Sequence, residues 1–329
     1  MKTHIGLYGM GLLMLVAGGC GAQPALLGVE DYLFITHDTL ALPGETVDLS
    51  ARVLGGDLLQ PQAGLLVRFA RPGEPLGVAE TDGAGQAVYA YTPAEPGDYL
   101  FDVDVAPIGL ADPPPVRQLR LACRPAHQPM AIVDLDHTVV ATGFETVLLG
   151  DAKAMDDSVA VLKALAEKNT IVYLTHRPEL FGPKSKQWLA AQGYPPGPVL
   201  LSSITGFVQG SGEFKAEQLR KLRSRFKRIE IGIGDKISDA RAYAENGMQS
   251  VLINLNNENQ AAGDIEATVL LIQRIEDLPE SVAVVRSWQQ AREVLFDGAE
   301  YPPAQAVERL EKRLGVLRDQ QRQAEEGEE

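Results

Sequence analysis

The sequence predicts an all-β domain, then an α/β domain built on a parallel sheet, and finally a group of helices. Between residues 30 and 123, short alternating strands are separated by Pro-Gly and Asp-Gly turns, which is typical of a β-sandwich. From residue 130 onward, apolar runs that end in carboxylate or hydroxyl side chains alternate with helical stretches, which predicts βαβ units. The length of 329 residues also exceeds that of a single ordinary domain.

The amino terminus has the pattern of a secretory signal. Met1-Lys2 precedes an apolar run at residues 5–16, which is too short to span a bilayer stably, and Ala17-Gly18-Gly19-Cys20 follows it. This segment resembles a bacterial lipoprotein signal, and the resemblance implies removal of residues 1–19 and acylation of Cys20. An uncleaved anchor is the alternative.

A lipoprotein signal implies that the chain is held on a membrane by a lipid anchor. Two or more acyl chains anchor a protein stably, and residues 20–29 would form the tether. Gly21 gives no retention signal of the aspartate type. We therefore expect a cell envelope lipoprotein in the outer membrane, facing the periplasm.

Five strands are expected in the all-β domain, at residues 47–53, 65–69, 86–91, 99–105 and 116–121. Two of the turn segments between them, Thr81-Asp82-Gly83 and Pro96-Gly97-Asp98-Tyr99, resemble those of bacterial immunoglobulin-like domains of surface proteins. We expect an immunoglobulin-like β-sandwich over residues 30–123 and a linker at 124–129. The absence of a catalytic cluster there favours a spacer or binding module.

Composition excludes several kinds of site. Cys20 and Cys123 are the only cysteines, so acylation of the first leaves the second with no partner for a disulfide or a thiolate metal site. Cys123 is therefore expected to be a buried or boundary residue. The formal net charge of −14 excludes nucleic acid as an expected partner.

Asp134-Leu135-Asp136-His137-Thr138 directly follows the apolar run at residues 130–133. Two carboxylates at the end of a buried strand are electrostatically costly unless a cation or a reaction uses them. In an open parallel sheet, ligands bind in the crevice beyond the strand ends. This motif alone is also compatible with Asp and Thr acting only as capping residues in a turn.

Three further elements follow in order. A β-branched run at 170–174 ends in Thr175-His176-Arg177-Pro178, Lys215 opens an amphipathic helix, and a strand that begins at Ile229 ends in Gly234-Asp235. Together with the first motif, over about residues 128–256, they resemble the haloacid dehalogenase (HAD) superfamily of phosphohydrolases. The resemblance implies a Rossmann-like parallel sheet, with a catalytic core over residues 130–275.

The resemblance also implies a role for each catalytic residue. Asp134 would be the nucleophile that forms an aspartyl-phosphate, and Asp136 would protonate the leaving alcohol and then deprotonate water. Thr175 would donate a hydrogen bond to a phosphoryl oxygen, and Lys215 would neutralise negative charge. A purely structural hydroxyl at Thr175 and an ordinary exposed lysine at Lys215 are the alternatives.

A Mg²⁺ ion is the cofactor that the resemblance implies. Asp134, Asp235 and the backbone carbonyl of Asp136 would hold it, because Mg²⁺ suits oxygen ligands. Asp239 would complete the acidic cluster as a ligand or a supporting group. Its alternative role is to cap the helix expected after it.

Four residues are candidates for substrate contacts: Thr138, His137, His176 and Arg177. His137 stands where many relatives carry glycine. Arg177 and His176 offer cations to an anionic substrate in a loop. For His137, His176 and Arg177 a structural role stays equally open.

The intervals between the motifs leave no room for a cap domain. One helix at about 157–167 fits before Thr175, and one helix at about 184–192 with a strand at 199–201 fits before Lys215. A capless core has an open active site, which suits bulky substrates such as lipid headgroups and excludes water less well around a small metabolite.

Finer resemblance concerns the substrate. Residues 197–202, 213–219 and 234–243 resemble the catalytic domain of the lipins and of the fungal actin-patch phosphatidate phosphatases. This implies Mg²⁺-dependent removal of phosphate from phosphatidate or a related lipid phosphate. Members of this group attached to phosphatidylinositol-transfer proteins bind phosphatidate without hydrolysing it, but the presence of both Asp134 and Asp136 favours hydrolysis. A broad periplasmic phosphomonoesterase and a non-catalytic lipid-binding or envelope module are the alternatives.

Residues 276–329 are expected to form C-terminal helices at 282–296 and 303–325, with a disordered acidic tail after Ala324. Val307, Leu310, Leu314 and Leu317 form an apolar seam that favours docking on the same chain over dimerisation. The oligomeric state stays open.

The stretch at 215–228 is locally basic against the acidic background. Its apolar positions, Leu219, Leu222 and Phe226, recur at helical spacing, so the cations occupy the solvated face. A solubilising helix face is one interpretation, and a contact with an anionic membrane beside the active site is the other.

Overall fold

The computed structural model describes residues 32–56, 58–106, 114–143, 146–147, 150, 152–203, 207 and 210–327. The chain divides into two compact units, and each is considered by itself. The first contains the chain up to Arg124 with the short segments Val147–Asp151 and Glu179–Lys186, and the second contains the remainder. The expected signal, the tether and Cys20 lie outside the described residues.

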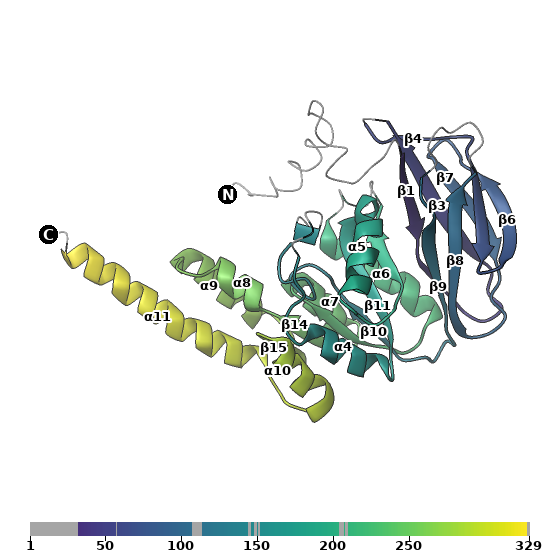
Figure 1. Cartoon of the computed structure of the whole chain (residues 1–329). Helices are drawn as coiled ribbons and strands as arrows, with labels where there is room; N and C mark the ends of the chain where they lie inside the picture. The colour runs from purple at the N-terminus through teal and green to yellow at the C-terminus, as the bar shows by residue number, and fades with distance from the viewer. Residues whose placement is uncertain are drawn as a thin grey trace. The chain divides into compact units, whose positions relative to one another are not determined.

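The first unit consists of two β-sheets (Figure 1). One sheet contains β1 (Tyr32–His37), β3 (Val47–Gly55), β4 (Gln60–Pro61) and β7 (Gln86–Tyr91), with β3 paired antiparallel to each of the others. The other has the order β2-β9-β8-β5-β6, formed by β2 (Thr39–Ala41), β9 (Arg117–Cys123), β8 (Gly97–Val105), β5 (Leu66–Arg71) and β6 (Glu74–Glu80).

The two sheets enclose one hydrophobic core. Phe34 and Leu49 from one sheet and Phe69, Phe101 and Leu121 from the other belong to the same buried cluster. In β5 and β8, buried and more exposed positions alternate, because successive side chains point to opposite faces of a sheet. The expected all-β region is confirmed, while β1, β2, β4 and β6 are strands that the sequence pattern did not predict.

The second unit is built on a six-stranded parallel sheet with the order β12-β11-β10-β13-β14-β15. Its strands are β10 (Met130–Val133), β11 (Thr170–Pro178), β12 (Val199–Ser202), β13 (Ile229–Gly234), β14 (Gln249–Ile253) and β15 (Val282–Val285). The four residues of β10 are all buried, as expected for a central strand covered on both faces. The chain leaves β10 toward β11 and β12, then returns to β13 on the other side of β10, so β10 and β13 flank the topological switch point.

Helices lie between these strands and after the last one. They are α4 (Ser158–Ala166), α5 (Gly182–Ala191), α6 (Ser211–Arg225), α7 (Ile237–Glu245), α8 (Leu255–Gln260), α9 (Ile265–Glu276), α10 (Trp288–Arg292) and α11 (Pro303–Gly327). Right-handed crossovers place α4 on one face of the sheet and α6, α7 and α9 on the opposite face, because the winding direction reverses after β12. The expected α/β architecture with a parallel sheet is confirmed.

Two expectations for the C-terminal region are wrong. The stretch at 282–296 was expected to be one helix, but Val282–Val285 is the strand β15, and α10 starts only at Trp288 after the cap Ser287. A short apolar run cannot be assigned to helix or strand by periodicity alone. The acidic tail after Ala324 was expected to be disordered, whereas α11 continues to Gly327.

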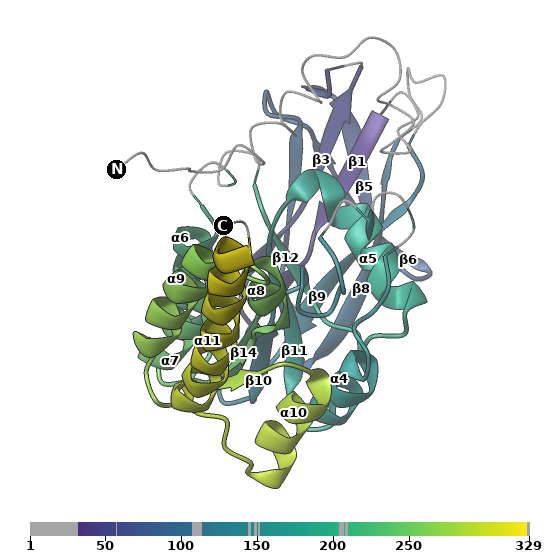
Figure 2. The same cartoon turned by 90° about the vertical axis from the view of Figure 1, so that its left-hand side faces the viewer.

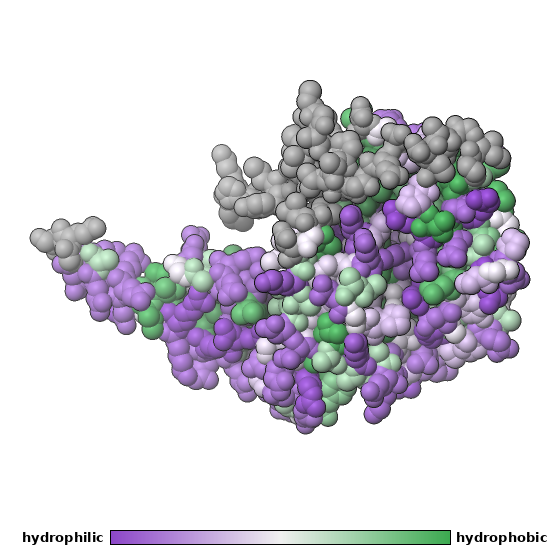
Figure 3. All heavy atoms as spheres, viewed as in Figure 1, coloured by the Kyte–Doolittle hydropathy of each residue, from purple (hydrophilic) through white to green (hydrophobic). Residues whose placement is uncertain are grey.

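The seam of α11 packs on its own unit. Leu310 and Leu314 are buried in one cluster with Leu271 and Ile275 of α9, and Figures 1 and 2 show α11 running beside α9. The outward surface of α11 is largely hydrophilic (Figure 3). Among the helices of the described residues, none is long and apolar enough to cross a membrane.

Candidate active site

The carboxyl ends of β10 and β13 bring Asp134 and Asp235 to the same edge of the sheet. Asp134 directly follows β10, and its backbone N–H donates to the carbonyl of Ile233 in β13 (3.0 Å). The two carboxylates are only 3% and 4% exposed. Parallel pairing of these two strands therefore joins residues that lie about a hundred positions apart in the sequence.

Lys215 lies between two carboxylates. Its Nζ is 2.8 Å from Oδ2 of Asp134 and also pairs with Oδ2 of Asp239. Burial alone lowers the pKa of this lysine, but the charges of Asp134 and Asp239 outweigh it and raise the pKa well above the usual value. Lys215 is thus a permanently charged, oriented cation, and the alternative of an ordinary exposed lysine is wrong because the side chain is 1% exposed.

Asp134 is held in a fixed orientation. Its Oδ1 accepts a hydrogen bond from the backbone N–H of Leu135 (2.8 Å), while Oδ2 faces Lys215. Asp239 lies in the first turn of α7 and is completely buried against Lys215. Asp239 therefore positions the lysine in this structure, and no side-chain cap bond is formed at the start of α7.

Asp235 has the environment of a cation ligand. Its Oδ1 is buried and has no hydrogen-bond partner. Burial and, next, the charge of Asp134 raise its pKa to about 7. Bound Mg²⁺ would satisfy this oxygen and offset the repulsion between the two carboxylates, so the donor set fits the ion. In the described part of the chain, however, no group of three or more His, Cys, Asp or Glu residues is gathered as a metal centre.

Asp136 is bound by Arg177. The guanidinium donates from Nε to Oδ2 (3.0 Å) and from Nη2 to Oδ1 (2.7 Å), so the pair is bidentate. Arg177 is 1% exposed at its side chain, and Asp136 is 24% exposed. Arg177 thus contacts the expected acid–base residue rather than standing free for substrate.

His137 has a left-handed backbone, with φ of 53°. This conformation costs energy for any residue with a Cβ, although asparagine, aspartate and histidine adopt it more often than other side chains. Glycine would adopt this backbone conformation without that cost. His137 lies in the turn between Asp136 and Thr138, and its side chain is half-buried.

The other candidates lie along β11 and the turn after β10. Thr175 is 1% exposed, and its Oγ1 accepts from the backbone N–H of Arg177 (3.3 Å). His176 stacks on Phe207, with ring centroids 4.9 Å apart. Thr138 is fully buried with no hydrogen-bond partner for its hydroxyl, which leaves a donor available near the strand end.

Two aromatic residues that the sequence pattern did not single out support the catalytic turn. Trp288 of α10 donates from Nε1 to the carbonyl of Thr138 (2.6 Å), and Tyr194 donates from its hydroxyl to the carbonyl of Val139 (2.9 Å). Such contacts are non-local, so no motif could have revealed them. They fix the backbone that carries Asp136 and His137.

The intervals between the motifs contain only short elements in the described residues. Between Asp136 and Thr175 lies α4, and between Thr175 and Lys215 lie a 3₁₀ turn (Glu179–Phe181), α5 and β12. No additional domain is formed by the described residues of these intervals.

The basic stretch is separated along α6 from the candidate catalytic residue Lys215. Lys215 lies near the start of this 15-residue helix, and Arg223 and Arg225 lie in its last turn, about 15 Å away at 1.5 Å per residue. Cations at a helix C-terminus complement the helix dipole. The helix leads to the start of β13, so its basic end lies at the opposite edge of the sheet, and a membrane contact by this stretch beside the active site is not supported.

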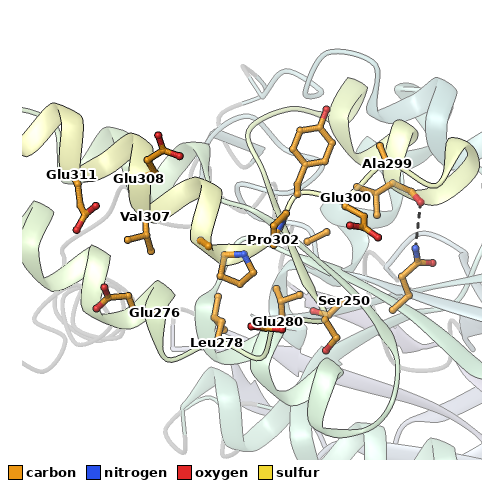
Figure 4. Close-up of a pocket in the computed structure, with 18 residues that line it drawn as sticks. Ser250, Glu276, Leu278, Glu280, Ala299, Glu300, Pro302, Val307, Glu308 and Glu311 are labelled. Carbon is orange, nitrogen blue, oxygen red and sulfur yellow. Dashed lines mark hydrogen bonds between the residues drawn. The ribbon is translucent and has the colours of Figure 1, made fainter.

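A cavity of about 820 Å³ also lies away from the catalytic edge. It is formed at the amino ends of β14 and β15, and none of the candidate catalytic residues lines it. Glutamates from α9 and α11 and the loops between them, among them Glu276, Glu280 and Glu308, surround Leu278 and Pro302 (Figure 4). A phosphate would be repelled there, so this cavity is not the substrate site of a phosphatase.

Comparison with known proteins gives matches to solved structures and to one family model. No curated protein matches the chain. The solved structures that match include the D00-D0 domain of intimin, with 17% identity, 29% of this chain and 50% of that chain covered, and a TM-score of 0.23. They also include the titin M3 domain, with 15% identity, 28% and 96% covered, and a TM-score of 0.21. The Ig1-2 module of the Drosophila receptor protein tyrosine phosphatase DLAR gives 12% identity, 34% and 64% covered, and a TM-score of 0.24.

The α/β unit has a match of its own. Residues 131–254 match the family model described as PITM 1-3, LNS2 domain. The matched segment begins within β10 and ends directly after β14, so it includes Asp134, Thr175, Lys215 and Asp235. The segment that forms the candidate active site is therefore similar to the LNS2 domain, a lipin-like family of phosphatase type.

Proposed function

We propose that the α/β unit is a Mg²⁺-dependent phosphatase that acts through an aspartyl-phosphate on phosphatidate or a related lipid phosphate. The observation that carries the proposal is the meeting of Asp134, Lys215 and Asp235 at one strand-end edge, with a buried Asp235 oxygen that lacks a partner. The likeness of residues 131–254 to the LNS2 domain supports the lipid substrate class.

The first chemical step belongs to Asp134 and Asp136. An oxygen of Asp134 attacks phosphorus, the bond from phosphorus to the leaving oxygen breaks, and Asp136 donates a proton to that oxygen. In the second step Asp136 accepts a proton from water, the water oxygen attacks phosphorus, and the bond to Asp134 breaks to release inorganic phosphate. The turn held by Trp288 and Tyr194 keeps the two carboxylates in register for both steps.

Positive charge in the site comes from two side chains of the chain itself. Lys215 is buried beside Asp134, where it stabilises the charge that builds up on the phosphoryl oxygens. Arg177 fixes the orientation of Asp136 through its two hydrogen bonds. Thr175 and Thr138 offer hydroxyl groups near the strand ends.

Asp134, Asp235 and the backbone carbonyl of Asp136 would hold Mg²⁺, which when bound neutralises charge on the transferring phosphoryl group. Asp239 supports this set indirectly, because its carboxylate is committed to Lys215.

The proposal includes a location at the cell envelope, which suits a lipid substrate. With Cys20 acylated, the enzyme would act at the cell envelope, where phospholipid phosphates would be within reach of the open site that a capless core implies. A second candidate function is a non-catalytic lipid-binding module. It is favoured by the match to an LNS2 model of the PITM type, because the resembling domains on phosphatidylinositol-transfer proteins bind phosphatidate without cleaving it.

The test is phosphate release by the chain that begins at Cys20. Phosphatidate in mixed micelles and a soluble aryl phosphate are supplied with Mg²⁺, and Asp134→Asn is run in parallel. Release that prefers phosphatidate and disappears in the variant is the expected result. Turnover of the aryl phosphate alone would indicate a broad phosphomonoesterase. No turnover together with binding to phosphatidate vesicles would indicate the lipid-binding module.

A further inference from the structure

A chain of polar contacts connects Asp235 with residues beyond the matched segment. Asn257 in α8 donates from Nδ2 to the backbone carbonyl of Asp235 (2.8 Å) and to Oδ1 of Asn254 (3.0 Å). Asn254 is completely buried and in turn donates from Nδ2 to Oε1 of Glu258 (3.2 Å). Two asparagines thus link the peptide of a candidate metal ligand to a glutamate.

Glu258 is the centre of this network. Its side chain is 5% exposed, and its carboxylate pairs with Arg309 of α11 (2.7 Å) and with Arg286 (3.0 Å), which lies just after β15. Arg313 of α11 also donates to its backbone carbonyl (3.1 Å). A carboxylate this deeply buried is stable only when it is paired, so the arginines hold Glu258 in place.

The contacts of the network connect α11 with Asp235 in sequence. The C-terminal helix α11 holds Glu258, Glu258 orients Asn254, and Asn257 ties the group to Asp235. All members except Asp235 and Asn254 lie after residue 254, where the match to the LNS2 domain ends. The C-terminal elements, which were expected only to dock on the core, therefore reach the edge of the candidate active site.

We propose that Asn257 and Glu258 are positioning residues for Asp235 and that α11 serves as a brace that keeps the Asp235 segment in its binding geometry. The residue after Asp235, Lys236, accepts at its carbonyl from the backbone N–H groups of Asp239 and Ala240 (3.0 Å each). A loosened Asp235 peptide would disturb this turn and with it Lys215, which pairs with Asp239. The inference rests on the proposed function for its chemical meaning, but its structural content is independent of catalysis.

A purely structural role makes a different prediction. If the network only stabilised the fold, its loss would lower the free energy of unfolding of the whole unit. Hydrogen exchange at residues 235–240 would then not increase more than exchange elsewhere. A positioning role requires that loss of the network speeds amide hydrogen exchange at residues 235–240 more than it does elsewhere in the unit. Supporting hydrogen bonds of this kind typically change metal affinity by about 10–100-fold when they are removed.

The experiment uses two variants, each with a matched control on the same helix. Asn257→Ala is compared with Asn259→Ala, since Asn259 is exposed in α8, and Arg309→Gln with Arg318→Gln, since Arg318 is exposed in α11. Amide hydrogen exchange at Asp239 and Ala240 is measured in chelator, and Mg²⁺ affinity is measured by calorimetry with the metal alone. Circular dichroism confirms folding of each variant.

We expect Asn257→Ala and Arg309→Gln to speed exchange at Asp239 and Ala240 about fivefold to tenfold, the equivalent of one lost hydrogen bond, while the controls match the parent chain. Mg²⁺ affinity should fall about tenfold in Asn257→Ala. Unchanged exchange in both variants would overturn the proposal, and a response limited to Asn257→Ala would overturn the bracing role of α11. A parent chain that releases no phosphate but shows the exchange response would refute the proposed function alone.

Discussion

Asp235 is the single residue whose environment departs most clearly from that of a free carboxyl group. Its pKa is raised from 3.8 to about 7 by burial and by the charge of Asp134. Between these two values the folded chain binds a proton that the unfolded chain does not bind. In the absence of a cation, this group therefore favours folding below about pH 4 to 5, and its contribution is lost as the pH rises toward 7.

Asp235→Asn should remove this pH dependence. In chelator, the variant should be more stable than the parent chain at pH 8, and the gap should narrow at pH 5. Urea unfolding at the two pH values measures the difference. The exposed Asp277→Asn serves as the control, and an equal effect of both substitutions at pH 8 would contradict the assignment.

His137 offers a second test at the same scale, because its φ of 53° is strained. His137→Gly should relieve this strain and leave the free energy of unfolding unchanged or raised by up to about 1 kcal/mol. His137→Val should lower it by more than 1 kcal/mol, since a β-branched residue adopts this conformation poorly. Chemical denaturation of the three chains decides the matter, and equal stability of all three would argue against backbone strain.

The residues that the sequence could locate are those fixed by local pattern. Asp134, Thr175 and Asp235 follow apolar runs. The structure places Asp134 and Asp235 directly after β10 and β13, whereas Thr175 lies inside β11, which continues to Pro178. The pairing of Asp136 with Arg177 could not be predicted, because it depends on how the turn after β10 meets the last residues of β11. The hydrogen bond from Asn257 to the carbonyl of Asp235 could not be predicted from the sequence either, because it also depends on the tertiary structure.

Among the elements, β13 and α7 pack closely against each other near the site. A Cβ at Gly232 would lie 2.3 Å from the ring of Tyr243 on α7, a distance that no packing arrangement permits. Tyr243 is completely buried, and burial raises the pKa of its hydroxyl. The glycine therefore allows α7, which carries Asp239, to approach the strand that carries Asp235.

Gly232→Ala should cost about 1–3 kcal/mol of stability, the usual range for overpacking, and should weaken phosphate release by displacing α7. Gly212→Ala in α6 is the matched control, because a Cβ there would find its nearest neighbour only at 3.8 Å. Thermal unfolding and phosphate release are compared for both. A Gly232→Ala chain as stable as the control would show that the ring of Tyr243 can move aside.

Elements with strong periodicity were predictable, and short ones were not. The helices at 157–167 and 303–325 were expected within two residues of their observed ends. Val282–Val285 was missed as a strand because four apolar residues precede a helix without a turn signal between them. Its pairing with β14 depends on the tertiary structure, which the local sequence does not show. The short edge strands β2 and β4 carry too few residues to show a pattern.

The whole second unit depends on α11, because this helix closes one side of its core. Leu310 is 1% exposed within the cluster that also contains Leu271, Ile275 and Val282. Leu310→Ala should cost about 2–5 kcal/mol, whereas Val316→Ala, at a position that is 56% exposed, should change stability by less than about 0.5 kcal/mol. Unfolding at two protein concentrations checks this, since a seam used for dimerisation would make the midpoint depend on concentration.

For the whole molecule, the order of domains was predictable from composition and turn signals, since an all-β region and an α/β region differ in both. The parallel sheet followed from alternating strands and helices. The extension of that sheet to β15 was not predictable, because the strand lies beyond the motifs that define the core.

The distribution of three side chains makes the stability of each unit separately observable. The only tryptophans, Trp188 and Trp288, are both buried in the second unit. Cys123 is fully buried in the first unit, and burial raises the pKa of its thiol, which suppresses its reactivity while the β-sheets remain closed. In a Cys20→Ser chain, thiol labelling therefore times the opening of the first unit, and tryptophan fluorescence reports the second, so that one sample reveals whether the two unfold together or in succession.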